Sequence, residues 1–273
     1  MEQYVADHVI RIGQGEPMLL IHGLGHRKEA WDPVLPALGG RFDVAAADLP
    51  GFGGADPLAE APTDGALADH CEALMDAMGW DTAHLVGNSL GGLIALRLGS
   101  RGRARSVTAL SPGGQMVGWE QTWARAVLRL NRTIAPHALR VPALSDTAIG
   151  RRIAMASVFG RPERMNRAYA RLSIEGLAQA SAFEAVLDCA RWQVDDVADI
   201  PAPVTIAWGS RDWLLLPRQG VRWATALGDG ARLVKLAGLG HTPMPDDPDV
   251  VVDVIVRTAA RATSRESAAS HAG

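Results

Sequence analysis

The chain has 273 residues, of which 48% are apolar, 21% are charged and 5% are aromatic. A chain of this length forms one large or two ordinary domains with a sizeable buried core. Its formal net charge of −3 provides no overall positive potential, which argues against nucleic acid as a partner. The apolar runs are far shorter than the roughly 20 residues that span a bilayer, and no basic leader segment opens the chain. We therefore expect a cytoplasmic protein without stable membrane insertion.

Short apolar runs bounded by Gly, Pro or Asp have the composition of buried parallel strands. Segments with helical spacing of apolar residues lie between most of them, for example Leu67, Cys71, Leu74 and Met78. This alternation predicts an α/β fold, an open and mostly parallel sheet with helices on both faces. Residues 2 to 13 are expected to add an antiparallel edge. The predicted parallel strands are Pro17 to Ile21, Phe42 to Ala47, Ala83 to Val86, Ser106 to Leu110, Val204 to Trp208 and Ala231 to Leu236.

The alternation stops over residues 113–199, where apolar residues keep helical spacing and no convincing strand occurs. We predict that this segment is an all-helical lid over the carboxyl edge of the sheet, where open α/β proteins bind ligands. The core that carries the sheet then comprises residues 1–112 and 200–262. The segment 263–273 is rich in Ser and Ala and is expected to be a disordered tail.

A Gly-x-Ser-x-Gly motif, Gly87 to Gly91, follows one predicted strand and precedes a predicted helix. A strand that turns abruptly into a helix strains its apex residue, and glycines two positions before and after remove Cβ atoms that would clash. The turn presents the Ser89 hydroxyl at a helix N-terminus, which favours negative charge. In this context the motif predicts that Ser89 is a nucleophile rather than a structural turn residue.

A serine nucleophile needs a base, and the base needs an orienting carboxylate. His241 follows the last predicted strand, and Asp212 follows the strand before it, at the same edge of the sheet as Ser89. The oxyanion needs backbone donors, for which the N–H groups of Leu90, next to the nucleophile, and Leu24, in the first strand's turn, are best placed. No metal or organic cofactor enters this scheme, and Cys71 and Cys189 lack metal-ligand spacing.

The chain resembles the α/β-hydrolase superfamily in five segments that occur in the family's order. The resemblance implies Ser89, Asp212 and His241 as the triad and a hydrolytic reaction at an acyl carbon. A serine at the elbow differs from the aspartate of epoxide hydrolases and haloalkane dehalogenases. The segments are His22 to Gly25, Asp48 to Gly53, Gly87 to Gly91, Gly209 to Asp212 and Gly240-His241.

These residues favour a serine esterase acting on a small-molecule ester, thioester or lactone. Two alternatives remain open. The elbow, continued to Gly92, is also similar to that of hydrolases that cleave carbon–carbon bonds in ring-fission products, although the segment after His241, Thr242 to Pro245, departs from them. A non-catalytic ligand receptor that kept the fold is the second alternative, because a fold alone does not define activity.

The segment from Arg101 to Arg171, most of which lies in the predicted lid, carries an unusual charge. From Arg101 to Arg171 there are thirteen arginines and no lysine against three acidic residues, a formal charge of +10, so that the rest of the chain carries −13. Solvated helix faces account for most such runs, but the charge also raises the expectation of an anionic acyl substrate. Trp119 and Trp123, at helical spacing in the lid, are candidate walls of the substrate pocket.

Overall fold

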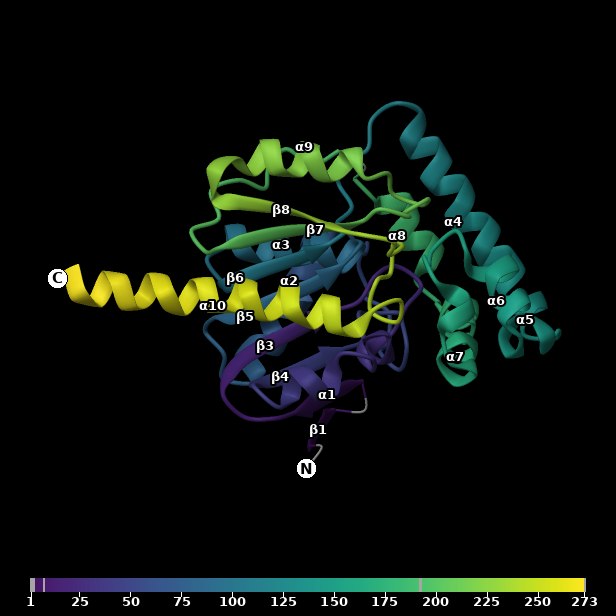
Figure 1. Cartoon of the computed structure of the whole chain (residues 1–273), viewed down its shortest axis with the longest axis horizontal. Helices are drawn as coiled ribbons and strands as arrows, with labels where there is room; N and C mark the ends of the chain where they lie inside the picture. Colours follow the sequence, from purple (N-terminus) through teal and green to yellow (C-terminus); the bar gives the residue numbers. More distant parts are fainter. Residues whose placement is uncertain (1–2, 7, 192, 273) are drawn as a thin grey trace.

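The computed structural model describes residues 3–6, 8–191 and 193–272, and its centre is an eight-stranded sheet (Figure 1). The strand order is β1-β2-β4-β3-β5-β6-β7-β8. All pairs from β4 to β8 are parallel, whereas β1 and β2 form the expected antiparallel edge. The strands are β1 (Gln3–Ala6), β2 (Val9–Ile12), β3 (Glu16–Ile21), β4 (Phe42–Ala47), β5 (Ala83–Asn88), β6 (Ala104–Leu110), β7 (Val204–Gly209) and β8 (Ala231–Leu236).

The predicted α/β fold is therefore confirmed, and every predicted parallel strand is present. Residues 2 and 7 of the predicted edge lie outside the described residues. All six residues of β5 and of β7 are buried, as expected for parallel strands covered on both faces.

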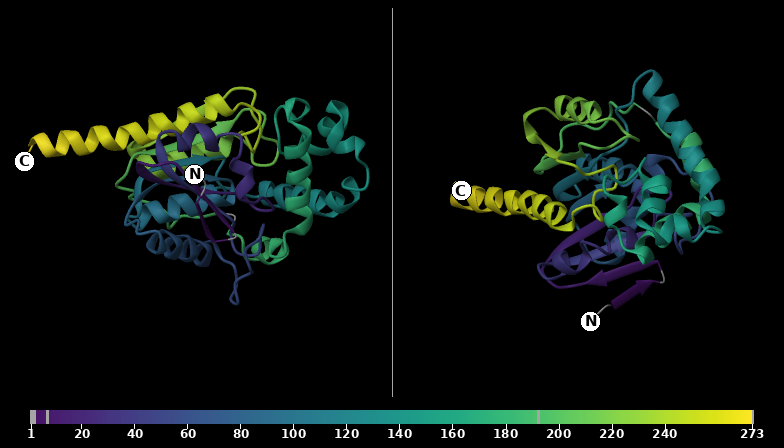
Figure 2. Two further views of the ribbon diagram at one scale, coloured as in Figure 1. Left: turned by 90° about the horizontal axis from the view of Figure 1, so that it is seen from below. Right: turned by 45° about the vertical axis from the view of Figure 1, so that its right-hand side comes forward.

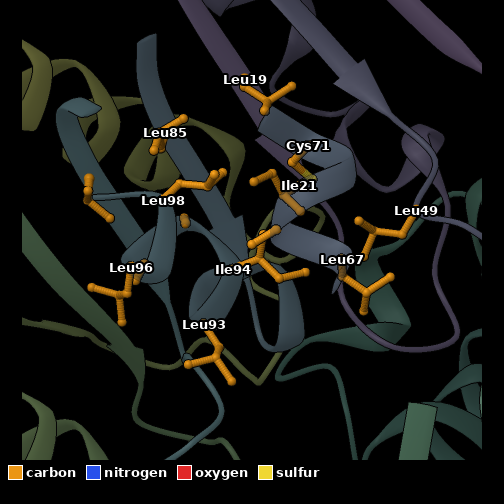
Figure 3. Close-up of a cluster of buried hydrophobic side chains, with 14 of the residues drawn as sticks. Leu19, Ile21, Leu49, Leu67, Cys71, Leu85, Leu93, Ile94, Leu96 and Leu98 are labelled. Carbon is orange, nitrogen blue, oxygen red and sulfur yellow. The ribbon is translucent and has the colours of Figure 1, made fainter. Parts of the chain in front are cut away.

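Helices cover both faces of the sheet, and β3 shows how its residues divide between them. On one face, Leu19 and Ile21 belong to a core cluster with residues of α2 (Asp64–Ala77) and α3 (Leu90–Ser100) (Figure 3). Trp223 of α9 (Arg218–Leu227) belongs to the same cluster. Met18 and Leu20 pack with the short helices η1 (Lys28–Trp31) and α1 (Leu35–Gly39) and with α10 (Pro248–Ala272) on the other. This alternation follows from the two-residue period of a strand.

The segment between β6 and β7 is helical, as predicted, apart from one isolated bridge between Gln115 and Gln193. We call it the helical insertion. It has a small core of its own, to which Ala135, Met155, Phe159 and Tyr169 contribute. Figures 1 and 2 place α4 to α7 beside the sheet, on the side opposite the end of α10. Its elements are α4 (Trp119–Ala138), α5 (Ala143–Asp146), α6 (Ala148–Met155), η2 (Pro162–Arg164), α7 (Arg167–Gln179) and α8 (Phe183–Cys189).

The expectation of a disordered tail from residue 263 is wrong, because α10 continues to Ala272 and projects beyond the sheet (Figure 2). Ala259 and Ala262 anchor the helix against the core. An Ala-rich segment has high helix propensity, and extending an anchored helix avoids the cost of nucleation. Within the described part of the chain, no helix combines the length and apolar character required to cross a membrane.

Candidate active site

The turn from β5 into α3 holds Ser89 in a strained conformation, with φ 58° and ψ −115°. A Cβ atom on Gly87 would lie 2.0 Å from the carbonyl oxygen of Gly91, and one on Gly91 would lie 2.1 Å from that of Ile21. Only glycine fits at these two positions, as the motif predicts. Such strain is typical of residues whose exposure at a turn serves a function.

Asp212 and His241 form a buried pair at the ends of β7 and β8. The Nδ1 atom of His241 lies 2.8 Å from Oδ2 of Asp212, and both residues are 3% exposed. The other oxygen, Oδ1, accepts the amide protons of Leu214 at 3.0 Å and Leu215 at 2.8 Å. A carboxylate held in this way accepts the Nδ1 proton, so that Nε2 of the neutral imidazole is free to accept another.

Asn88 connects the elbow to the loop that carries His241. Its buried Nδ2 donates to the carbonyl oxygen of Leu110 at 3.1 Å and to that of His241 at 2.9 Å. The Thr242 hydroxyl lies 3.4 Å from Asn88 Oδ1. Asn88 occupies the variable position between Gly87 and Ser89, so the motif does not single it out. Its contact with His241 joins residues more than 150 positions apart in the chain.

Ser89 and His241 both line a cavity of about 460 Å³, the size of a small-ligand site. Asp212 lies behind the imidazole, outside the cavity lining. Among the described residues no hydrogen bond joins the Ser89 hydroxyl to His241, and such contacts commonly tighten only when substrate binds.

Leu24 and Leu90 also line this cavity. The turn that carries Leu24 abuts the elbow, since a Cβ atom on Gly23 would lie 3.0 Å from Cβ of Ser89. Neither amide proton has an acceptor within the described chain. The four residues predicted to surround the reacting carbonyl therefore converge on one space.

Two acceptor side chains hold the backbone around the Leu24 turn. His22 is buried, and its Nε2 accepts the Leu49 amide proton at 2.9 Å, which leaves the Nδ1 proton for the carbonyl oxygen of Gly23 at 2.8 Å. Burial lowers the pKa of His22, which keeps the ring neutral in this role. Asp48 accepts the amide protons of Lys28 at 2.6 Å and Gly54 at 3.0 Å. Both residues are structural supports of the site.

His26 is a cavity residue to which the sequence assigns no role. Its ring stacks on Phe159 of the helical insertion, with 6.2 Å between centroids and 12° between planes. Burial, together with His22 and His241, lowers the pKa of His26 to about 3. A neutral imidazole therefore faces the substrate space. Its place in the turn after β3 is the one signal that could have identified it.

The structure does not bring Trp119 and Trp123 to the cavity, which corrects the expectation that they form its wall. Both lie on the N-terminal half of α4, near α9 and the Asp212 turn. Trp119 is 61% exposed with the Arg218 guanidinium 4.9 Å from its ring centroid, and Trp123 Nε1 donates to the carbonyl oxygen of Trp213 at 2.9 Å. The C-terminal half of α4 provides the cavity wall instead.

The insertion gives the cavity a mainly apolar wall. None of the thirteen arginines between Arg101 and Arg171 belongs to the cavity lining. Within the described chain, Arg191 is the one arginine in that lining, and it is paired with Asp64 and Asp196, each at 3.1 Å. The insertion residues of the wall include Leu128, Ile134, Ile153, Ile174, Leu177 and Leu187.

A parallel sheet with a strained serine elbow and a buried acid–histidine pair at its carboxyl edge defines the class of α/β-fold hydrolases. The sequence matches the alpha/beta hydrolase family over residues 18–254, and the chain belongs to that family.

Particular relatives carry different activities. The chain is 30% identical to an epoxide hydrolase, EphH, of Mycobacterium tuberculosis over 69% of this chain and 91% of that protein. An esterase from Thermogutta terrifontis is similar in structure, with a TM-score of 0.71, 19% identity and 93% of each chain covered. A meta-cleavage product hydrolase from Pseudomonas fluorescens gives a TM-score of 0.72 at 22% identity, covering 93% of this chain and 94% of that one.

Proposed function

We propose that the protein is a serine hydrolase that cleaves a small-molecule carboxylic ester, thioester or lactone through an acyl-enzyme on Ser89. The observation that carries this proposal is the convergence of Ser89, His241 and the unpaired amides of Leu24 and Leu90 on one apolar cavity. Asp212 also supports the proposal. Its two oxygens accept three hydrogen bonds, and the one from His241 Nδ1 favours the tautomer in which Nε2 is a base.

In the proposed mechanism the Ser89 oxygen attacks the acyl carbon while Nε2 of His241 takes the hydroxyl proton. The amides of Leu24 and Leu90 bind the oxyanion that forms. Collapse breaks the bond to the leaving group, which departs with the proton from His241. Water then enters and attacks the acyl carbon while His241 takes one of its protons. The bond between the acyl carbon and the Ser89 oxygen breaks, His241 returns the proton to that oxygen, and the acid is released.

The chemistry of the elbow argues against epoxide opening, despite the similarity to an epoxide hydrolase. The family's epoxide hydrolases use an aspartate at the elbow, whereas this chain has serine there. A serine nucleophile requires activation by a histidine and a carboxylate. His241 and Asp212 form a buried, hydrogen-bonded pair beside Ser89.

Carbon–carbon hydrolysis is a second candidate, because the elbow from Gly87 to Gly92 is similar to that of enzymes of this type. The structural neighbour from Pseudomonas fluorescens has the same fold. Both candidates use Ser89, so the substrates distinguish them. Neutral acyl esters suit the apolar wall. The thirteen arginines from Arg101 to Arg171 lie outside the cavity lining, and Arg191, which lines it, is paired with Asp64 and Asp196, so the cavity does not favour an anionic acyl group.

The test is a panel of nitrophenyl esters of graded acyl length, run beside a ring-fission dienoate, with Ser89→Ala as the blank. We expect turnover of esters that depends on Ser89, and an alkyl phosphonate adduct that peptide mass spectrometry locates on Ser89. Cleavage of the dienoate without ester turnover would favour the second candidate. A folded protein with an unlabelled Ser89 and no turnover would favour a ligand receptor.

A further inference from the structure

Large apolar side chains surround the mouth of the cavity and face solvent. Leu130 is 58% exposed, Ile134 44% and Ile153 74%, and all three also line the cavity. Ile149 is 75% exposed and lies one helical turn before Ile153 on α6, and therefore shares its face. Isolated exposed apolar residues are ordinary, but a group gathered around one opening indicates an interaction surface. We call these four residues the mouth patch.

The fold holds the α6 part of this patch outward. Arg151, on the opposite side of α6, is 7% exposed and donates to three carbonyl oxygens, those of Ser145 at 2.9 Å and of Pro162 and Glu163 at 3.0 Å. The backbone at Gly150 is so close to Ala143 that a Cβ atom would lie 1.9 Å from its carbonyl oxygen. Rotating α6 to bury its isoleucines would expose these carbonyl groups and create a clash. The exposure is therefore built into the packing of the insertion.

Positive charge accompanies the mouth patch. Arg140 follows the end of α4, and Arg152 adjoins Ile153 on α6. Within the part of the chain that the structure describes, neither of these two arginines has an acidic partner within 4.0 Å. The helical insertion, residues 113–199, has eleven arginines against nine acidic residues, a formal charge of +2, and the rest of the chain has −5. The insertion that carries the mouth patch is therefore slightly positive, whereas the rest of the chain is acidic.

We propose that the mouth patch and these arginines dock on the surface of an anionic lipid bilayer. The apolar side chains enter the boundary between headgroups and acyl chains, and the arginines pair with lipid phosphates. The acidic core is repelled and stays on the aqueous side, which orients the cavity mouth toward the lipid. A second copy of the chain is a poorer occupant, because a symmetric contact would bring the same arginines face to face.

This docking also identifies a source of substrate. An acyl chain could pass from the lipid layer along Leu130, Ile134 and Ile153 into the cavity without crossing water. The substrate class that follows is acyl esters held in a membrane. That step rests on the proposed serine hydrolase function, whereas the docking surface does not.

The test is flotation of the full chain with vesicles of phosphatidylcholine alone or mixed with phosphatidylglycerol. We expect binding to the mixed vesicles, which weakens as salt rises from 0.1 to 1 M. Ile149→Asp should reduce the affinity about tenfold or more. Neutralising Arg140 and Arg152 together by Gln should reduce it about 25-fold, at about fivefold for each arginine. The matched control is Val221→Asp on α9, which is 54% exposed and should bind normally.

Two comparisons separate the docking surface from the chemistry. Ser89→Ala should float like the wild type, and Ile149→Asp, whose side chain is outside the cavity lining, should hydrolyse a water-soluble ester normally. Absence of wild-type binding to anionic vesicles, or equal loss in the Val221 control, would overturn the proposal. Wild-type dimers that Ile149→Asp converts to monomers, without vesicle binding, would instead assign the patch to a second copy.

Discussion

Replacing Asp212 by Asn tests the proposed triad, because the two oxygen atoms of this carboxylate have different hydrogen-bond partners. In the wild type Oδ1 accepts two amide protons, from Leu214 and Leu215, and Oδ2 accepts the Nδ1 proton of His241. An amide has one oxygen for these three donors. Placing its NH₂ group toward the two backbone amides leaves two buried donors unpaired, at about 1–3 kcal/mol each. The favoured orientation therefore keeps the oxygen on Leu214 and Leu215 and turns NH₂ toward His241.

In that orientation Nδ1 of His241 must act as an acceptor, so the ring proton moves to Nε2. The base is then unable to take the proton of Ser89, and the imidazolium loses its counter-charge. A serine protease with the corresponding change loses about 10⁴ in kcat, which corresponds to about 5.4 kcal/mol in the activation free energy. We expect a loss of this size here, measured as kcat on a soluble nitrophenyl ester with the Ser89→Ala rate subtracted.

Asp246→Asn is the matched control for this experiment. Asp246 is also a buried carboxylate with backbone donors beside the His241 loop, but it makes no hydrogen bond to the imidazole in the described structure. Its replacement should lower stability and leave most of kcat. A rate for Asp212→Asn within tenfold of the wild type, in a protein with an unchanged circular dichroism spectrum, would refute the assignment of Asp212.

Three further substitutions test the fold around the site. Tyr169→Phe removes a buried 2.9 Å hydrogen bond to Ala30 and should lower the free energy of unfolding by about 1–3 kcal/mol in urea titrations. Gly91→Ala places a Cβ atom 2.1 Å from a carbonyl oxygen of β3, and thermal melting should show severe destabilisation or no folded protein. Burial raises the pKa of Glu120, but hydrogen bonds from the arginines of α9 outweigh it and lower the pKa to about 2. Its stabilisation is complete above the unfolded value of 4.5 and declines as pH falls toward 2, so the stability gap to Glu120→Gln should narrow between urea titrations at pH 6 and pH 3.

The sheet and its catalytic edge are predictable from sequence for a local reason. Strands that are buried on both faces consist of short apolar runs. The strained elbow requires glycine at positions 87 and 91. Ser89, Asp212 and His241 each follow a strand, and parallel strands bring their carboxyl ends to one edge. The placement of these three residues therefore depends on the order of the elements more than on details of packing.

The wall of the site is less predictable, because it depends on how the insertion docks. Helical spacing groups Trp119 and Trp123 with Ile134 on one stripe of α4, but the periodicity does not indicate which half of the helix reaches the cavity. The contact between His26 and Phe159 joins two segments more than 130 residues apart. Such long-range contacts leave no local pattern in a single sequence.

Two further long-range contacts connect the insertion to the loops of the catalytic edge. Asp246 accepts the amide protons of Gly160 at 2.8 Å and Gly240 at 2.7 Å, which ties the insertion to the loop of the catalytic histidine. The Trp123 indole ties α4 to Trp213, beside the catalytic acid. Displacing the insertion as a rigid body would break both connections and disturb the two loops that hold the acid–base pair. The mouth patch, on the C-terminal half of α4 and on α6, lies between these two attachments in the chain.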